Sequence, residues 1–120
     1  MSYMLLVLET HGDRQKRGFE AGQAAYASML RYAGDLKSRG LLKGGDALRT
    51  DAHGVRLTER AGKRLVVDGP FTESKEMIGG YFLVDCRTKE EAIALAKECP
   101  AAAWATIEVR EIGTCFEDLG

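Results

Sequence analysis

Hydrophobic residues fall along the chain in runs and stripes that predict alternating strands and helices. Residues 3–8 are apolar without interruption, which is typical of a strand covered on both faces. Residues 18–39 carry apolar side chains at helical spacing, and Gly40 supplies a stop signal for that helix. Residues 41–48 predict a second strand, with a bulge or bend at the glycine pair 44–45.

The second half of the chain continues this alternation. It predicts two hairpin strands at residues 55–59 and 63–67 and a third strand of the main sheet at residues 81–86. A second helix follows at residues 88–99 and a last strand at residues 104–112. Arg60-Ala61-Gly62 lies between the two hairpin strands and gives the hairpin signal. Thr88 with Glu91 forms a capping box that opens the second helix, and Pro100 ends it. These elements predict an α+β fold in one domain over residues 1–112, followed by a tail at 113–120.

The first strand also predicts an assembly. Both of its alternating sets of side chains are apolar, whereas two helices can cover only one face of a sheet. The other face therefore needs a partner, and a homodimer formed face to face is the simplest solution. The alternative is that the hairpin of residues 55–67 folds over the second face within one subunit.

Composition narrows the classes of function. A net charge of -1 over 120 residues provides no concentrated basic face, so we expect no nucleic-acid and no membrane partner. The apolar run at residues 4–8 is too short for a signal segment, and three widely spaced cysteines favour reduced thiols. We therefore expect a cytoplasmic location.

The stretch Asp68-Gly69-Pro70-Phe71-Thr72-Glu73-Ser74-Lys75-Glu76 gathers acid and base side chains around a forced turn. Gly69 and Pro70 require the preceding strand to end at Asp68. Asp68 is a candidate general base if its surroundings desolvate it. Alternatively, Asp68 accepts backbone N–H bonds from the turn and has a structural role.

The other side chains of this stretch have the same two interpretations. Glu73 or Glu76 is a candidate second carboxylate, and Glu73, Lys75 and Phe71 are candidate ligand-binding residues. The alternative is that the charged residues form a solvated surface cluster, because exposed charges cost little.

The last predicted strand places Glu108 and Arg110 on the face that the dimer would cover. They are either an ion pair with a structural role or an anion site in which Arg110 holds a ligand carboxylate. His11 follows the first strand directly and is the second candidate for proton transfer, since histidine titrates near neutral pH. His53 lies in a polar loop where we expect it to be exposed.

Other kinds of site lack their motifs. The glycine pairs at 44–45 and 79–80 do not have the spacing of a phosphate-binding loop. Two isolated histidines and scattered acids give no metal-ligand pattern. We expect no metal and no cofactor.

The motif at residues 68–71 closely resembles the signature of the DGPF proteins, a branch of the YCII-related family. The resemblance extends to Gly79-Gly80-Tyr81, and to segments 3–7, 44–48 and 107–110 in the same order. It implies a ferredoxin-like fold of the dimeric α/β-barrel type, dimerised through its sheet, with a cleft for a small molecule. Tyr81 joins the ligand-binding candidates on this ground.

Some YCII-related proteins carry a His and Asp pair that suggests acid/base chemistry. No such pair can be matched residue by residue, because the segment after the second helix reads Ala101-Ala102-Ala103-Trp104 without a histidine. DGPF relatives also resemble partners of alternative sigma factors in bacterial regulation. The resemblance does not imply a substrate.

Together these observations predict a homodimer that binds a small, anionic organic molecule in a cleft near the sheet interface. The alternative is an enzyme in which Asp68 or His11 transfers protons without a cofactor, in an elimination, isomerisation or hydrolysis. A regulatory partner protein is the third class.

Overall fold

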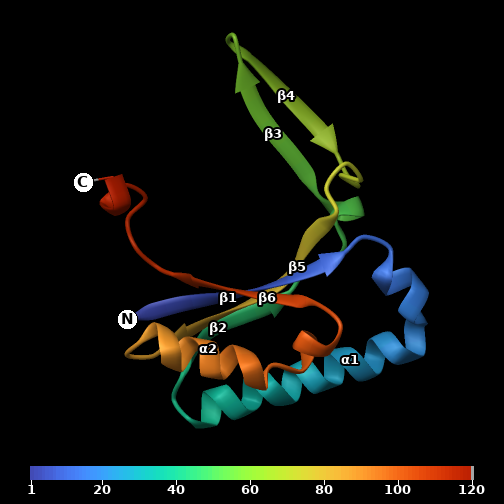
Figure 1. Ribbon diagram of the computed structural model, residues 1–120. Helices are drawn as coiled ribbons and strands as arrows, with labels where there is room; N and C mark the ends of the chain where they lie inside the picture. The colour runs from blue at the N-terminus through green and yellow to red at the C-terminus, as the bar shows by residue number, and fades with distance from the viewer. Residues whose placement is uncertain (120) are drawn as a thin grey trace.

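The computed structural model describes residues 1–119 and shows within them a four-stranded antiparallel sheet, a separate two-stranded hairpin and two α-helices (Figure 1). The elements are β1 (Ser2–Thr10), α1 (Asp13–Ser38), β2 (Leu42–Ala47), β3 (Val55–Arg60), β4 (Lys63–Asp68), β5 (Glu76–Asp85), α2 (Lys89–Glu98) and β6 (Thr106–Glu111). Short 3-10 turns lie at Asp51–His53, Pro100–Ala103 and Glu117–Leu119. The strand order β2-β5-β1-β6 confirms the ferredoxin-like α+β fold.

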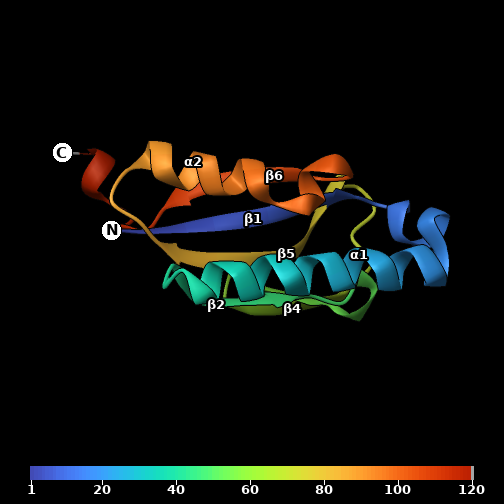
Figure 2. The ribbon, with the colours of Figure 1, turned by 90° about the horizontal axis from the view of Figure 1, so that it is seen from below.

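Both helices lie on one side of the sheet (Figure 2). Tyr3, Leu5 and Val7 of β1 are buried under them, while the residues between these three are only half buried on the opposite face. Burying such a side chain contributes about 1.5 to 3 kcal/mol, so these three residues are a substantial part of the core. The hydroxyl of Tyr32 in α1 donates to the Leu95 carbonyl of α2 at 2.6 Å and fastens the helices together.

Several boundaries differ from the sequence prediction. Helix α1 begins at Asp13, because Gly12 and Gly18 adopt positive φ angles of 89° and 82° that let the chain enter the helix early and kink inside it. Strand β5 begins at Glu76, with a register shift opposite Val7 and Leu8 of β1. The cap of α2 is confirmed, since Thr88 Oγ1 accepts from Glu91 N at 3.1 Å.

Strands β3 and β4 form an arm that stands away from the main sheet on the side opposite the helices (Figure 1). Every residue of the arm strands is exposed. Ala61 and Gly62 turn the arm with φ angles of 51° and 76°, as the hairpin signal predicted. The radius of gyration is 16.3 Å, whereas a compact chain of this length has about 14 Å. The arm therefore does not fold over the open face of its own sheet.

Within residues 1–119, no helix has both the length and the apolar character needed to cross a bilayer.

Candidate functional site

A histidine and an aspartate meet at the end of β1. His11 follows that strand, and Asp51 begins the 3-10 turn before β3, forty positions later. His11 Nε2 and Asp51 Oδ2 lie 2.5 Å apart, and the two side chains are only 20% and 16% exposed. Charge-assisted hydrogen bonds from nitrogen to a carboxylate are about 2.7 to 2.9 Å long, and this contact is shorter still.

The two groups shift each other's titration. The hydrogen bond to Asp51 raises the pKa of His11 above its ordinary value of 6.5, against the smaller opposing effect of burial. The same bond is the largest cause that lowers the pKa of Asp51 below 3.8, and bonding to Phe71 N lowers it further. Over the range between these ordinary values, the pair is an imidazolium facing a carboxylate.

The second ring nitrogen of His11 has a different environment. Nδ1 is buried and makes no hydrogen bond within residues 1–119. The backbone carbonyls of Lys75 and Ser74 lie close enough to raise the pKa of the ring, and the Lys75 carbonyl accepts from His11 N at 3.1 Å. The loop before β5 therefore covers this edge of the imidazole.

The loop that carries the signature motif, residues 68–71, which we call the signature loop, holds Asp51 in place. Phe71 N donates to Asp51 Oδ2 at 3.2 Å, and Gly69 N donates to the Gly54 carbonyl at 2.9 Å. A Cβ atom at Gly69 would lie 1.7 Å from the Asp51 carbonyl oxygen, so only glycine lets the two backbones approach. These contacts give the motif an architectural role: it positions the carboxylate opposite His11.

An aromatic side chain, Phe71, and a cation, Arg56, also lie beside the His11–Asp51 pair. Phe71 is buried, and the Arg56 guanidinium of β3 lies 3.8 Å above its ring. Arg56 also bonds Glu73 at 3.2 Å, and its charge is a minor cause of the lowered pKa of Asp51. A guanidinium is thus held beside the pair by a cation–π contact.

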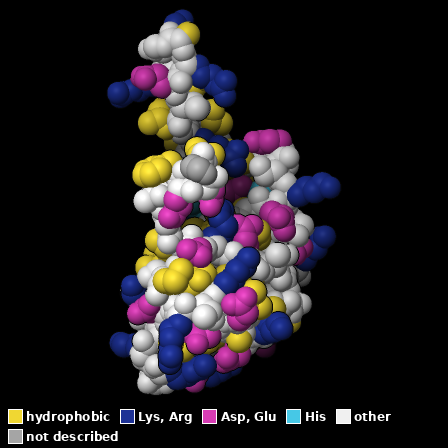
Figure 3. Space-filling view, turned by 60° about the vertical axis from the view of Figure 1, so that its left-hand side comes forward, with side chains coloured by type: hydrophobic (Ala, Val, Ile, Leu, Met, Phe, Trp, Pro, Cys, Tyr) yellow, Lys and Arg dark blue, Asp and Glu magenta, His cyan; other side chains and the backbone are white. Residues whose placement is uncertain are grey.

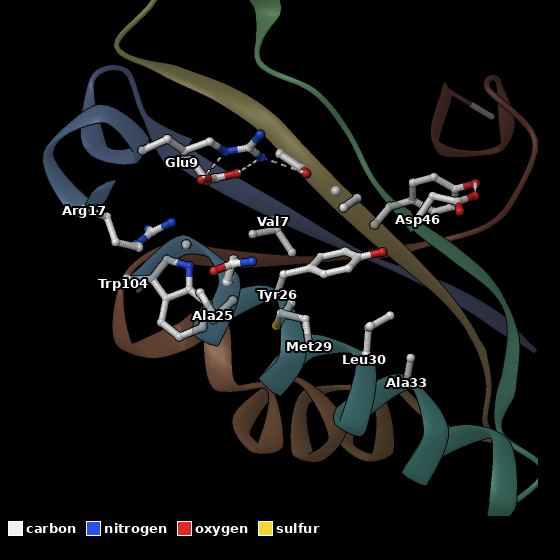
Figure 4. Close-up of a pocket in the computed structure, with 18 of the residues that line it drawn as sticks. Val7, Glu9, Arg17, Ala25, Tyr26, Met29, Leu30, Ala33, Asp46 and Trp104 are labelled. Atoms are coloured by element: carbon white, nitrogen blue, oxygen red, sulfur yellow. Dashed lines mark hydrogen bonds and ion pairs between the residues drawn. The ribbon is translucent and has the colours of Figure 1, made fainter. Parts of the chain in front are cut away.

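A second polar pair lies on the helix side of the same strand end, and is drawn in Figure 4. The Glu9 carboxylate is buried and accepts two hydrogen bonds from Arg14, at 3.0 Å to Oε1 and 2.5 Å to Oε2. Arg14 also donates to the carbonyls of Leu48 and Gly79 at 2.8 and 3.2 Å. Four of the five N–H donors of this guanidinium are thus engaged.

Three other predicted site residues, Asp68, Lys75 and Tyr81, bring no side chain to His11 and Asp51. Asp68 ends β4 as predicted, but it is exposed and makes no side-chain hydrogen bond within residues 1–119. Lys75 is exposed and reaches His11 only through its backbone. The Tyr81 hydroxyl lies 3.4 Å from Asp46 Oδ2, at the β2 edge of the sheet.

Glu108 and Arg110 form an ion pair of 3.1 Å with 41% and 68% of their side chains exposed. They pair with Leu6 and Met4 in β1, which places them on the edge strand β6, away from the end of β1 where His11 lies. In the isolated chain this pair is therefore a surface feature.

Sequence reasoning missed Asp51, Glu9 and Arg14. A signal for Glu9 existed, because it continues the buried alternation of Tyr3, Leu5 and Val7, and an acid on a core face needs a partner. Asp51 had no such signal, since its neighbours form a polar loop. Among residues 1–119, no group of three or more His, Cys, Asp or Glu side chains forms a metal-binding arrangement.

The fold and this site define a small ferredoxin-like α+β domain with a His–Asp pair at the end of its first strand. The model of the YCII-related domain matches residues 1–115, so the chain belongs to the YCII-related family. This confirms the resemblance seen in the sequence.

Known proteins that are similar to this chain include an uncharacterized protein and an enzyme of solved structure. An uncharacterized protein of Rhizobium meliloti (strain 1021) is 40% identical over 58 residues, and the match covers 47% of this chain and 47% of that protein. The chain thus matches about half the length of that relative. One similar solved structure is 5-chloro-2-hydroxyhydroquinone dehydrochlorinase (TftG) from Burkholderia phenoliruptrix AC1100, in complex with 2,5-dihydroxybenzoquinone. It has a TM-score of 0.54 and 18% identity, with 94% of each chain covered, and this likeness supports the fold.

Proposed function

We propose that this protein is a cofactor-independent acid/base enzyme that acts on a small organic anion at His11 and Asp51. The observation that carries the proposal is the 2.5 Å contact between His11 Nε2 and Asp51 Oδ2 in a half-buried setting. A carboxylate on one ring nitrogen orients the imidazole and stabilises its protonated form, which leaves the other nitrogen to exchange a proton with a substrate.

The proton path follows from the tautomer that this contact favours. Neutral His11 keeps its proton on Nε2 toward Asp51, so the lone pair of Nδ1 is the base. The loop that covers Nδ1 must shift to admit a substrate, which makes it a gate. His11 then takes a proton from carbon, and the carbanion either expels a leaving group or is protonated again at another atom.

Arg56 supports the choice of an anionic substrate. Its guanidinium lies beside the pair and is half exposed, so it can meet a carboxylate or an enolate. The solved relative is a dehydrochlorinase in complex with a hydroxyquinone. Small hydroxyquinones and enolisable keto acids are therefore the first probes for this chain.

A homodimer is part of the proposal. The open sheet face is only half buried along β1, and the arm exposes Leu57 and Val66 at 64% and 65% (Figure 3). An isolated two-stranded hairpin is marginally stable in water. A second copy docked on the open face covers both the face and the arm.

A cytoplasmic location is also part of the proposal. The free thiols of Cys86, Cys99 and Cys115 favour it, because the cytoplasm keeps thiols reduced.

Solvent exchange tests the proposal without a known substrate. Hydroxyquinones and keto acids are incubated in D₂O with the wild type, with His11→Asn and with Asp68→Asn as the matched control, and deuterium uptake is followed by ¹H NMR. We expect the wild type and the control to exchange alike, and His11→Asn to be about 100- to 10,000-fold slower. Equal exchange by His11→Asn, or no catalysed exchange by the wild type across both classes, refutes the enzyme.

A further inference from the structure

The helix side of the sheet carries a cleft that neither His11 nor Asp51 lines. It lies between α1, β2, β5 and the 3-10 turn at Pro100–Ala103, and its volume is about 620 Å³ (Figure 4). Pockets for small organic molecules fall in the range of about 300 to 1,000 Å³. The cleft is therefore large enough for a metabolite.

The helix α1 makes one wall of the cleft apolar. Phe19, Tyr26, Met29 and Leu30 line it, and three of them are strongly exposed, with exposed fractions of 82% for Phe19 and 54% each for Tyr26 and Leu30. Such a stripe at helical spacing normally packs on a core. Here it lines the cleft, and Gly22 on the same wall has open space where a side chain would begin.

One end of the cleft is positively charged. Glu9 and Arg14 neutralise each other there, as described above. Arg17 also lines this end, with its guanidinium 5.4 Å from the centre of the Trp104 ring, and it makes no ion pair within residues 1–119. The charges of these three groups leave one net positive charge beside an indole.

The other end of the cleft is negatively charged. Asp46 and the hydroxyl of Tyr81 lie there, across the apolar wall from Trp104 (Figure 4). A carboxylate is thus attracted to the Arg17 end and repelled at the Asp46 end, so the cleft orients an anion as well as binding it.

We propose that this cleft is a second binding site, for an amphipathic organic monocarboxylate. The apolar body lies along Tyr26, Met29 and Leu30, and the carboxylate accepts from Arg17 beside Trp104. This site is independent of the reaction proposed for His11 and Asp51, and it lies on the helix side of the sheet, whereas the sequence predicted a ligand cleft near the sheet interface.

Three matched probes test the charge requirement by isothermal titration calorimetry. They are 4-phenylbutyrate, 4-phenylbutanol and 4-phenylbutylamine, which share one apolar body and differ in their head group. We expect the carboxylate to bind the wild type most tightly. Arg17→Met should weaken the carboxylate at least about tenfold and leave the alcohol unchanged. Tighter binding of the amine, or no binding of any probe, overturns the proposal.

Two substitutions at one glycine test the location. A Cβ atom at Gly22 meets nothing within 4 Å, so Gly22→Ala should bind 4-phenylbutyrate like the wild type, whereas Gly22→Leu fills the cleft and should abolish binding. The melting temperature verifies that both variants fold. His11→Asn should bind 4-phenylbutyrate unchanged, which separates this site from the proposed catalytic one. Unchanged binding by Gly22→Leu, or loss of binding in His11→Asn, overturns the assignment.

Discussion

The Glu9 carboxylate occupies the space that a side chain at Gly79 would need. A Cβ atom at Gly79 would lie 1.5 Å from Glu9 Oε2 and 2.9 Å from a guanidinium nitrogen of Arg14. The acid cannot move aside, because Arg14 binds both of its oxygens and also the Gly79 carbonyl. The Glu9–Arg14 ion pair thus requires a glycine at position 79 of β5.

Substituting Gly79 should therefore destabilise the protein. We expect Gly79→Ala to lower the free energy of unfolding by about 2 to 3 kcal/mol, somewhat less than the loss of a fully buried pair, because Arg14 is partly exposed. Urea denaturation measures this. Gly22→Ala is the control, since it has open space and should stabilise α1 by up to about 1 kcal/mol. Equal effects of the two substitutions would contradict the dependence of Glu9 on Gly79.

The signature motif offers a second contrast between neighbouring residues. Gly69→Ala should lower the free energy of unfolding by about 2 to 3 kcal/mol, because its Cβ would collide with the backbone oxygen of Asp51. Asp68→Asn should change it by less than about 0.5 kcal/mol, because Asp68 is exposed. Denaturation of both variants under one set of conditions compares them. A larger loss for Asp68→Asn would give that residue the structural role that the contacts assign to Gly69.

The His11–Asp51 pair predicts a dependence of stability on pH with a definite sign. The raised pKa of His11 gives stability that is complete below 6.5 and is lost as the pH rises through the folded-state value. The lowered pKa of Asp51 gives stability that is complete above 3.8 and is lost as the pH falls through its folded-state value. The contribution of the pair should therefore be greatest between 3.8 and 6.5.

The difference in melting temperature between the wild type and Asp51→Asn, followed across this pH range, measures that contribution. In NMR titrations the His11 pKa should fall back toward 6.5 in Asp51→Asn, because the largest cause of its rise is removed. An unchanged His11 titration in the variant would show that another group raises its pKa.

The arm should matter for assembly and little for the fold of one chain. Val66 faces Leu57 across the hairpin, and both are exposed, so Val66→Lys should leave the subunit folded. If a second copy covers the arm, the same change should shift a dimer of the wild type at micromolar concentration toward monomer. Sedimentation velocity gives the distribution, with Lys63→Gln at the tip as the control. A wild type that sediments as a monomer contradicts the proposed dimer.

Local chemistry explains why much of the fold was predictable. The apolar run of β1, the Ala61-Gly62 turn and the Thr88 cap depend on residues that are close together in the chain. The glycine pair 44–45 predicted an irregularity in β2, and the register shift lies just before it, between Leu42 and Gly44. Helix and strand boundaries differ from the sequence prediction where glycines permit backbone conformations that hydrophobic periodicity does not reveal, as at Gly12 and Gly18.

The sequence by itself determined the order of elements, the ferredoxin-like class and the position of His11 at the end of a strand. Tertiary structure decided the partner of that histidine, because Asp51 is forty residues away and reaches it only when the signature loop closes around it. It also decided which face of β1 is buried, since both sets of side chains are apolar and only the helices distinguish them. Contacts between distant segments carry no local signature, and for that reason the site appeared only in the folded chain.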